Sequence, residues 1–122
     1  MEAPELLNNW AGKAPADVFI EFDVYRAVPV GEKPPFAGCE ILLASYGTPA
    51  YEGYAFVLFR KGGVLYEVNG SHCSCYGLEG QWEPEETTVE ALRHRLDHGR
   101  LGAGGYDDNP FADELRQVLE AL

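Results

Sequence analysis

Residues 54–69 read YAFVLFRKGGVLYEVN and decide the fold, because two strand-like runs flank a pair of glycines. Tyr54 to Arg60 is apolar on both alternating faces, which is typical of a strand covered on both sides of a sheet. Gly62 and Gly63 can adopt the positive φ angles of a tight antiparallel turn. Val64 to Asn69 is the returning strand, so the segment predicts a β-hairpin whose first strand is central.

Upstream of this hairpin the pattern predicts two more strands and a short helix. Glu40 to Tyr46 is apolar on both faces and predicts a strand. Asp17 to Tyr25 predicts another, with one face apolar and the other partly charged. Pro4 to Trp10 has apolar residues at helical spacing and predicts a short helix. Prolines and glycines in 29–38 and 47–53 predict the connecting loop and turn.

Downstream, two helices are expected. Thr87 and Glu90 have the spacing of a capping box, and Gly99 is a suitable terminator. The apolar stripe of this helix consists of Val89, Leu92 and Leu96. His94 and His98 fall opposite that stripe on a helical wheel, so we expect both to face water.

The last helix has Asn109 as its cap and Pro110 at its first position. Its apolar residues recur with helical period at Phe111, Leu115, Val118, Leu119 and Leu122. Because strands come first and helices last, the sequence predicts an α+β fold. We expect an antiparallel sheet of about four strands with the two C-terminal helices packed on one face, all in a single domain, 1–122.

Composition excludes several classes of function. Hydrophobic residues make up 46% of the 122, but the longest apolar run, Tyr54 to Phe59, is far too short to span a membrane. The start of the chain has no basic and apolar signal region, and the odd number of cysteines, three, argues against a disulfide framework. These features predict a cytoplasmic protein. A net charge of −11 without a basic cluster disfavours binding to nucleic acid or to anionic membranes.

The segment after the hairpin concentrates residues that can carry chemistry. Residues 70–82 read GSHCSCYGLEGQW and hold one of three histidines and two of three cysteines. His72, Cys73 and Cys75, with Cys39, could supply the ligands that zinc prefers. The Cys-x-Cys spacing, however, differs from the paired Cys-x2-Cys knuckles of most structural zinc sites.

A structural interpretation of this segment is favoured, and it requires no cofactor. In an extended chain His72 and Cys73 point to opposite faces, so their spacing does not imply a catalytic thiol–imidazole pair. Cys73 and Cys75 would face the core as small apolar side chains. Tyr76 and Trp82 would hold the loop against the sheet. A metal- or thiol-dependent protein centred on this segment is the alternative.

Acidic side chains gather next to the two helix starts. The first cluster has no intervening base and consists of Glu79, Glu83, Glu85, Glu86 and Glu90. The second consists of Asp107, Asp108, Asp113 and Glu114. Carboxylates stabilise a helix N-terminus, which explains part of this pattern. If the two helix starts lay side by side, they would form one negative surface suited to a basic partner.

The stretch from Tyr51 to Thr88, and above all its HCSCYGLEGQW core, resembles a group of small uncharacterised proteins encoded by bacteriophages and prophages. The resemblance covers roughly residues 51 to 98. It implies a product acting in bacterial cytoplasm and assigns no catalytic or binding residue. Small acidic phage proteins commonly bind host proteins, in some cases as anti-defence proteins with a DNA-like surface. We therefore expect a non-enzymatic protein that binds a host protein with a basic surface through its acidic clusters.

Overall fold

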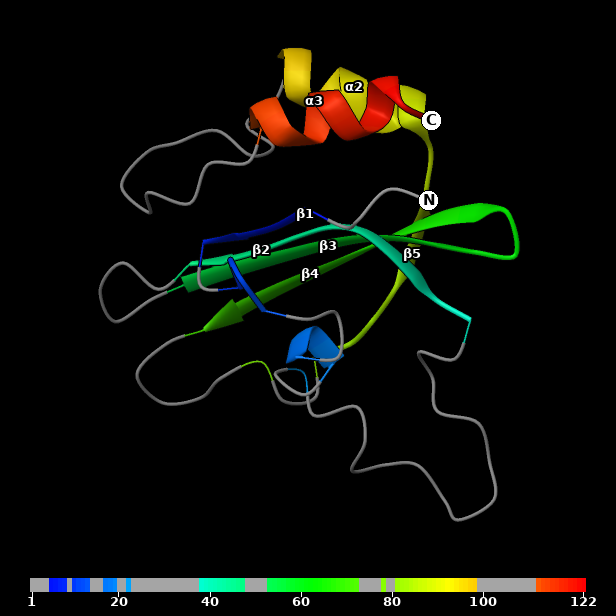
Figure 1. Cartoon of the computed structure of the whole chain (residues 1–122). Coiled ribbons are helices and arrows are strands. Elements are labelled where there is room, and N and C mark those ends of the chain that lie inside the picture. The colour runs from blue at the N-terminus through cyan, green and yellow to red at the C-terminus, as the bar shows by residue number, and fades with distance from the viewer. Residues whose placement is uncertain are drawn as a thin grey trace.

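The computed structural model describes residues 5–8, 10–13, 17–19, 22, 38–47, 53–72, 78, 81–98 and 112–122. It confirms an α+β fold, with a five-stranded sheet in the order β1-β2-β3-β4-β5 and two helices late in the chain (Figure 1). The elements are β1 (Glu5–Asn8), β2 (Glu40–Gly47), β3 (Gly53–Lys61), β4 (Val64–His72), β5 (Glu85–Thr87), α2 (Val89–His98) and α3 (Ala112–Glu120). Unlike the predicted sheet, this one is mixed, because β1 pairs with β2 in parallel.

The predicted hairpin is confirmed as β3 and β4, with β3 at the centre of the sheet. The two strands pair over their full length, from Gly53 with His72 to Lys61 with Val64. Gly62 and Gly63 form the turn with φ of 60° and 80°. Positive φ at both central positions matches the natural twist of antiparallel strands, and residues with a side chain adopt it only with strain.

Both C-terminal helices cover one face of the sheet, as predicted (Figure 1). Leucines of the two helices pack on sheet residues whose side chains share that face. This cluster contains Leu43, Phe56, Leu58, Leu92, Leu96, Leu115 and Leu119. A bulge in β2 between Ile41 and Leu43 lets Leu42 join Leu43 on this side, because the extra residue interrupts the alternation of the strand.

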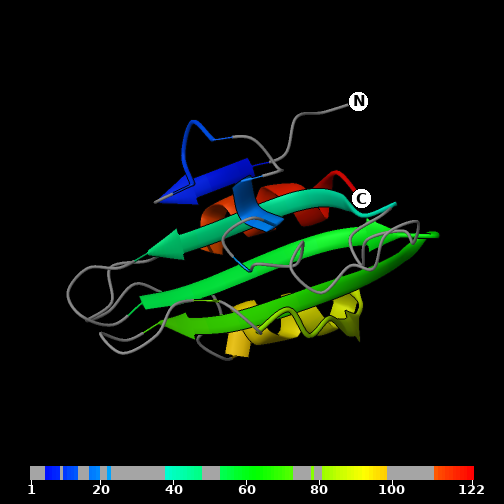
Figure 2. The same ribbon diagram turned by 90° about the horizontal axis from the view of Figure 1, so that it is seen from below.

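A second apolar cluster covers the opposite face. It is built around aromatic side chains from the first part of the chain and contains Trp10, Val18, Phe19, Phe22, Ile41, Ala44, Tyr46, Ala55, Val57, Phe59, Val68 and Leu78. A helical turn over residues 17–19 lies against this face (Figure 2). The central strands are therefore covered on both sides, which explains why most of their side chains are apolar.

Two predictions for the first part of the chain are wrong. Residues 5–8 of the predicted helix Pro4 to Trp10 form β1, which pairs with the edge of β2. A helix this short is marginal, whereas strand pairing satisfies the backbone of both segments. The predicted strand Asp17 to Tyr25 contains the helical turn instead: the Phe22 amide donates to the Val18 carbonyl at 3.3 Å, and the side chains of both are buried.

The boundaries near the C-terminal helices also differ from expectation. Thr88, not Thr87, caps α2, since its Oγ1 accepts a hydrogen bond from the Ala91 amide at 3.0 Å. Thr87 instead ends β5, a strand that the sequence analysis did not predict. Leu122 lies past the end of α3 and is exposed, so it does not belong to the apolar stripe of that helix. Gly99, Asn109, Pro110 and Phe111 lie outside the described residues, as do most of loop 29–38 and of turn 47–53.

Candidate functional site

The His-Cys segment is described only at its two ends. His72 is the last residue of β4 and its backbone pairs with Gly53. Cys73, Cys75 and Tyr76 lie outside the described residues, so the zinc, thiol and structural interpretations of this segment stay predictions. Within the described part of the chain, no group of three or more His, Cys, Asp or Glu side chains is placed to hold a metal ion.

Cys39, the upstream member of the predicted zinc set, is half-buried next to the aromatic cluster. Burial raises the pKa of its thiol because the thiolate would lose hydration, while the positive charge of Lys61 acts in the opposite direction. A thiol whose pKa is raised carries little thiolate at neutral pH, and the thiolate is both the nucleophile and the metal ligand. The environment of Cys39 thus suits a packed side chain better than a reactive one.

Trp82 has the packing role that the sequence predicts for it. Its ring stacks on Phe59 at a centroid distance of 5.5 Å, and it meets Phe19 and Phe22 edge-on at 5.4 and 5.2 Å. Aromatic rings at these separations attract one another in both geometries. Through this side chain, the end of the segment that follows β4 packs against the aromatic face of the sheet.

The first acidic cluster lies on the last strand of the sheet and the start of α2. Glu83, Glu85, Glu86 and Glu90 are all exposed, and we call these four residues the acidic edge. β5 pairs with β4 on one side, and no other described strand pairs with it. Glu85 and Glu86 thus belong to an edge strand, not to a helix entrance as the sequence suggested. Glu79 lies outside the described residues.

The register of β5 sends its two glutamates to opposite faces. Glu85 pairs with Glu67 and Glu86 pairs with Tyr66, and cross-strand partners share a face. Tyr66 packs against the aromatic cluster, whereas Glu67 lies on the face covered by the helices. The acidic edge therefore wraps around the rim of the sheet, with Glu85 on the helix side and Glu86 on the aromatic side.

The second acidic cluster does not join the first through its described members. Arg116, in the middle of α3, binds Asp97 Oδ1 at 2.7 Å and the Leu96 carbonyl at 3.2 Å, near the end of α2. The two helices run in opposite directions, so α3 begins on the side of the molecule where α2 ends (Figure 1). Asp113, in the first turn of α3, thus lies at the opposite end of the helix pair from the start of α2. Asp107 and Asp108 lie outside the described residues.

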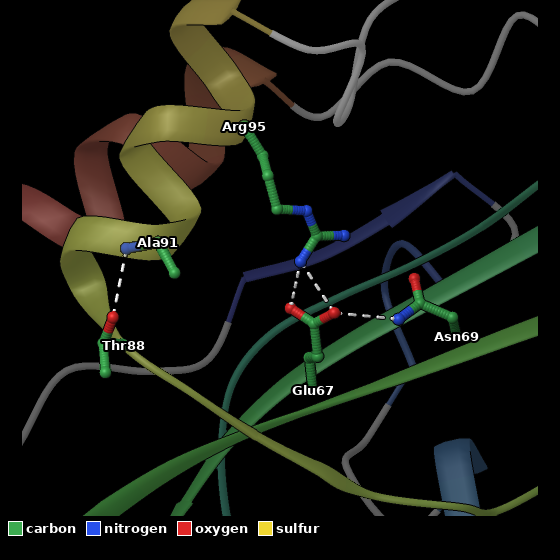
Figure 3. Close-up of polar contacts among 5 residues, drawn as sticks. All are labelled: Glu67, Asn69, Thr88, Ala91 and Arg95. Atoms are coloured by element: carbon green, nitrogen blue, oxygen red, sulfur yellow. Dashed lines mark hydrogen bonds and ion pairs between the residues drawn. The ribbon is translucent and has the colours of Figure 1, made fainter.

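A buried carboxylate that the sequence analysis missed lies behind the acidic edge (Figure 3). Arg95 of α2 reaches down to Glu67 of β4, and its Nη1 contacts both carboxylate oxygens, at 2.7 and 2.6 Å. Asn69 Nδ2 donates to Glu67 Oε1 at 3.1 Å. The Glu67 side chain is 7% exposed and that of Arg95 is 40% exposed. A buried carboxylate needs such partners, since an unpaired charge in the core is costly.

This network has an electrostatic consequence for the acidic edge. Like charges on directly opposed strand positions repel, and Glu67 faces Glu85 across the β4–β5 ladder. The guanidinium of Arg95 binds Glu67, so the positive charge of Arg95 is already matched by this buried acid. Arg95 therefore does not offset the exposed carboxylates of the acidic edge. The signal in the sequence was a single acid within the apolar strand 64–68, on the same side as Leu65, but a partner from a distant helix could not be inferred from it.

No helix in the described part of the chain combines the length and the apolar character that a membrane crossing requires. Comparisons with protein-family models, with curated proteins and with solved structures give no match for this chain.

Proposed function

We propose that this chain is a non-enzymatic binding protein whose acidic edge engages a host protein with a basic surface in bacterial cytoplasm. The observation that carries the proposal is the exposure of Glu83, Glu85, Glu86 and Glu90 around one edge strand. No Lys or Arg occurs between Glu83 and Glu90, so no basic side chain within this stretch offsets the four carboxylates.

The ion pair between Glu67 and Arg95 supports the same proposal. Arg95 is the α2 cation that reaches this part of the sheet, and it is bound to Glu67. A negative surface of this kind steers a positive partner during encounter and disfavours wrong partners by like-charge repulsion. Exposed charges are also screened by salt, so the affinity of such a complex falls as ionic strength rises.

Acids on an edge strand have a second use, because charged side chains prevent two edges from pairing with each other. Lysine serves that purpose as well as glutamate does. Replacing Glu85 and Glu86 by Lys therefore preserves protection of the edge and reverses only the sign of the charge. This substitution separates a binding surface from a merely protective one.

The test is affinity capture from a bacterial lysate with three immobilised baits: the wild type, Glu85→Lys/Glu86→Lys, and Asp113→Lys/Glu120→Lys. Both double variants change the net charge from −11 to −7, since each acid-to-lysine replacement adds two positive units. Asp113 and Glu120 are exposed on α3, which packs over β2, away from β5 (Figure 2).

We expect the wild type and Asp113→Lys/Glu120→Lys to capture one basic protein that salt elutes. We expect Glu85→Lys/Glu86→Lys not to capture it. Equal capture by the two double variants would show that Glu85 and Glu86 have no specific role in binding. Capture that resists salt would show that the interaction is not electrostatic. Either result would contradict the proposal.

A further inference from the structure

The exposed surface of α2 carries two histidines that face each other one helical turn apart. His94 and His98 are both exposed, and their ring centroids are 4.8 Å apart with an interplanar angle of 44°. Residues four apart on a helix lie on the same face, and histidines at this spacing are a recurrent zinc-binding pair. We propose that His94 and His98 form a two-histidine site for a divalent transition-metal ion such as Zn²⁺ or Ni²⁺.

The ring separation fits a shared metal ion. A metal–imidazole bond of about 2.1 Å places the ion about 3.2 Å from each ring centroid. Two such rings would have centroids about 4.5 Å apart at a ligand–metal–ligand angle of about 90° and about 5.2 Å apart at the tetrahedral angle. The observed 4.8 Å lies between these values. The separation of the two rings is therefore compatible with one ion bound by both imidazoles.

The charges around the pair favour a cation. The chain has a net charge of −11, and Glu90 lies one helical turn before His94 on the same exposed side of α2. Asp97 is held by Arg116, and this hydrogen bond is the main cause that lowers the pKa of its carboxyl group, with a smaller contribution from His98. Arg93 is the exposed cation that opposes metal binding on this helix.

Two protein ligands leave further coordination positions on the ion, which water or a ligand from another molecule can take. No third His, Cys, Asp or Glu among the described residues completes the set, so this is an open surface site and not a structural metal centre. The pair is preorganised only when α2 is helical. A bound ion therefore stabilises the folded state, by the linkage between ligand binding and folding.

The test uses Ni²⁺ as the probe, because nickel prefers imidazole and does not oxidise thiols as copper does. Affinity is measured by titration calorimetry for the wild type, His94→Ala, His98→Ala and the double alanine variant. The double variant reports binding by His72 and the cysteines. We expect each single variant to bind Ni²⁺ about tenfold more weakly or worse, because one ligand no longer holds the ion at high effective concentration for the other. The double variant should lose nothing further at this site.

A matched control keeps the number of histidines constant. Arg93→His/His98→Ala has two imidazoles on α2, at adjacent positions that do not face each other. We expect it to bind Ni²⁺ like His98→Ala and to lack the Ni²⁺-dependent rise in Tm that we predict for the wild type. Arg93, His94 and His98 are all exposed, and far-UV circular dichroism checks that each variant folds. Wild-type affinity in this control, or in the double alanine variant, would overturn the assignment.

Discussion

Replacing Arg95 with methionine removes its guanidinium and is the sharpest test of how α2 packs on the sheet. In Arg95→Met the apolar stem is largely retained, so the change isolates the charge and its hydrogen bonds. Glu67 would then keep only the Asn69 amide as a described partner while its side chain stays 7% exposed. The variant therefore leaves a carboxylate in the core without its counter-charge.

The expected cost lies between two limits. Loss of one partner of a fully buried ion pair costs about 3 to 5 kcal/mol, whereas an exposed pair contributes only about 0.2 to 1 kcal/mol. Because Arg95 is 40% exposed and water can partly hydrate the remaining charge, we expect Arg95→Met to lower the free energy of unfolding by about 2 to 3 kcal/mol. Urea denaturation followed by circular dichroism measures this change.

Arg116→Met is the matched control. Its ion pair with Asp97 is solvent-exposed on both sides, with side chains 44% and 53% exposed, so we expect a much smaller loss than in Arg95→Met. In Glu67→Met/Arg95→Met the unpaired charge is gone, and we expect recovery of much of the stability lost in Arg95→Met. If Arg95→Met and Arg116→Met had equal midpoints in urea, or if the double variant were the least stable, the reasoning about Glu67 would be refuted.

Three further outcomes follow from single contacts. Thr88→Ala should destabilise the protein by about 1 kcal/mol and Thr87→Ala by less, because Thr88 Oγ1 accepts a hydrogen bond from the Ala91 amide. Thermal unfolding of both variants checks the cap assignment. Gly70→Ala should destabilise the protein by about 1 kcal/mol, since a Cβ at this position would lie 3.1 Å from Leu78 and 3.2 Å from Phe22, both of which are tightly packed. A higher midpoint in urea than that of the wild type would contradict this expectation. Burial raises the pKa of Cys39, so its thiolate forms only at higher pH, and the charge of Lys61 partly offsets this effect. Lys61→Gln should therefore slow alkylation of Cys39 further, as peptide mass spectrometry would show. Faster alkylation would contradict the role of Lys61.

The sequence predicted those parts of the fold in which local pattern and tertiary packing agree. The β3–β4 hairpin has two apolar strands and a turn that needs positive φ, so neighbouring residues alone specify it. The stripe of Leu92 and Leu96 likewise predicts which side of α2 is buried. In these elements the local sequence pattern is sufficient to predict the conformation.

The prediction failed where contacts with a distant part of the chain determine the local conformation. Residues 5–8 form a strand because β2 offers a free edge to pair with, which no local pattern reveals. Val18 and Phe22 fit one face of a strand as well as one side of a helical turn, and only the aromatic cluster distinguishes them. For the candidate site, the exposure of the acids could be predicted, but their position on an edge strand and the Glu67–Arg95 pair depend on contacts across 28 residues of chain.

The most direct test of the proposed acidic edge is the affinity of the purified captured partner for the wild type and for Glu85→Lys/Glu86→Lys, measured over a range of salt concentrations. We predict that wild-type affinity falls steeply with salt, and that the double variant binds weakly at low salt with a much flatter dependence. The same affinity and the same salt dependence in both proteins would contradict binding through this edge.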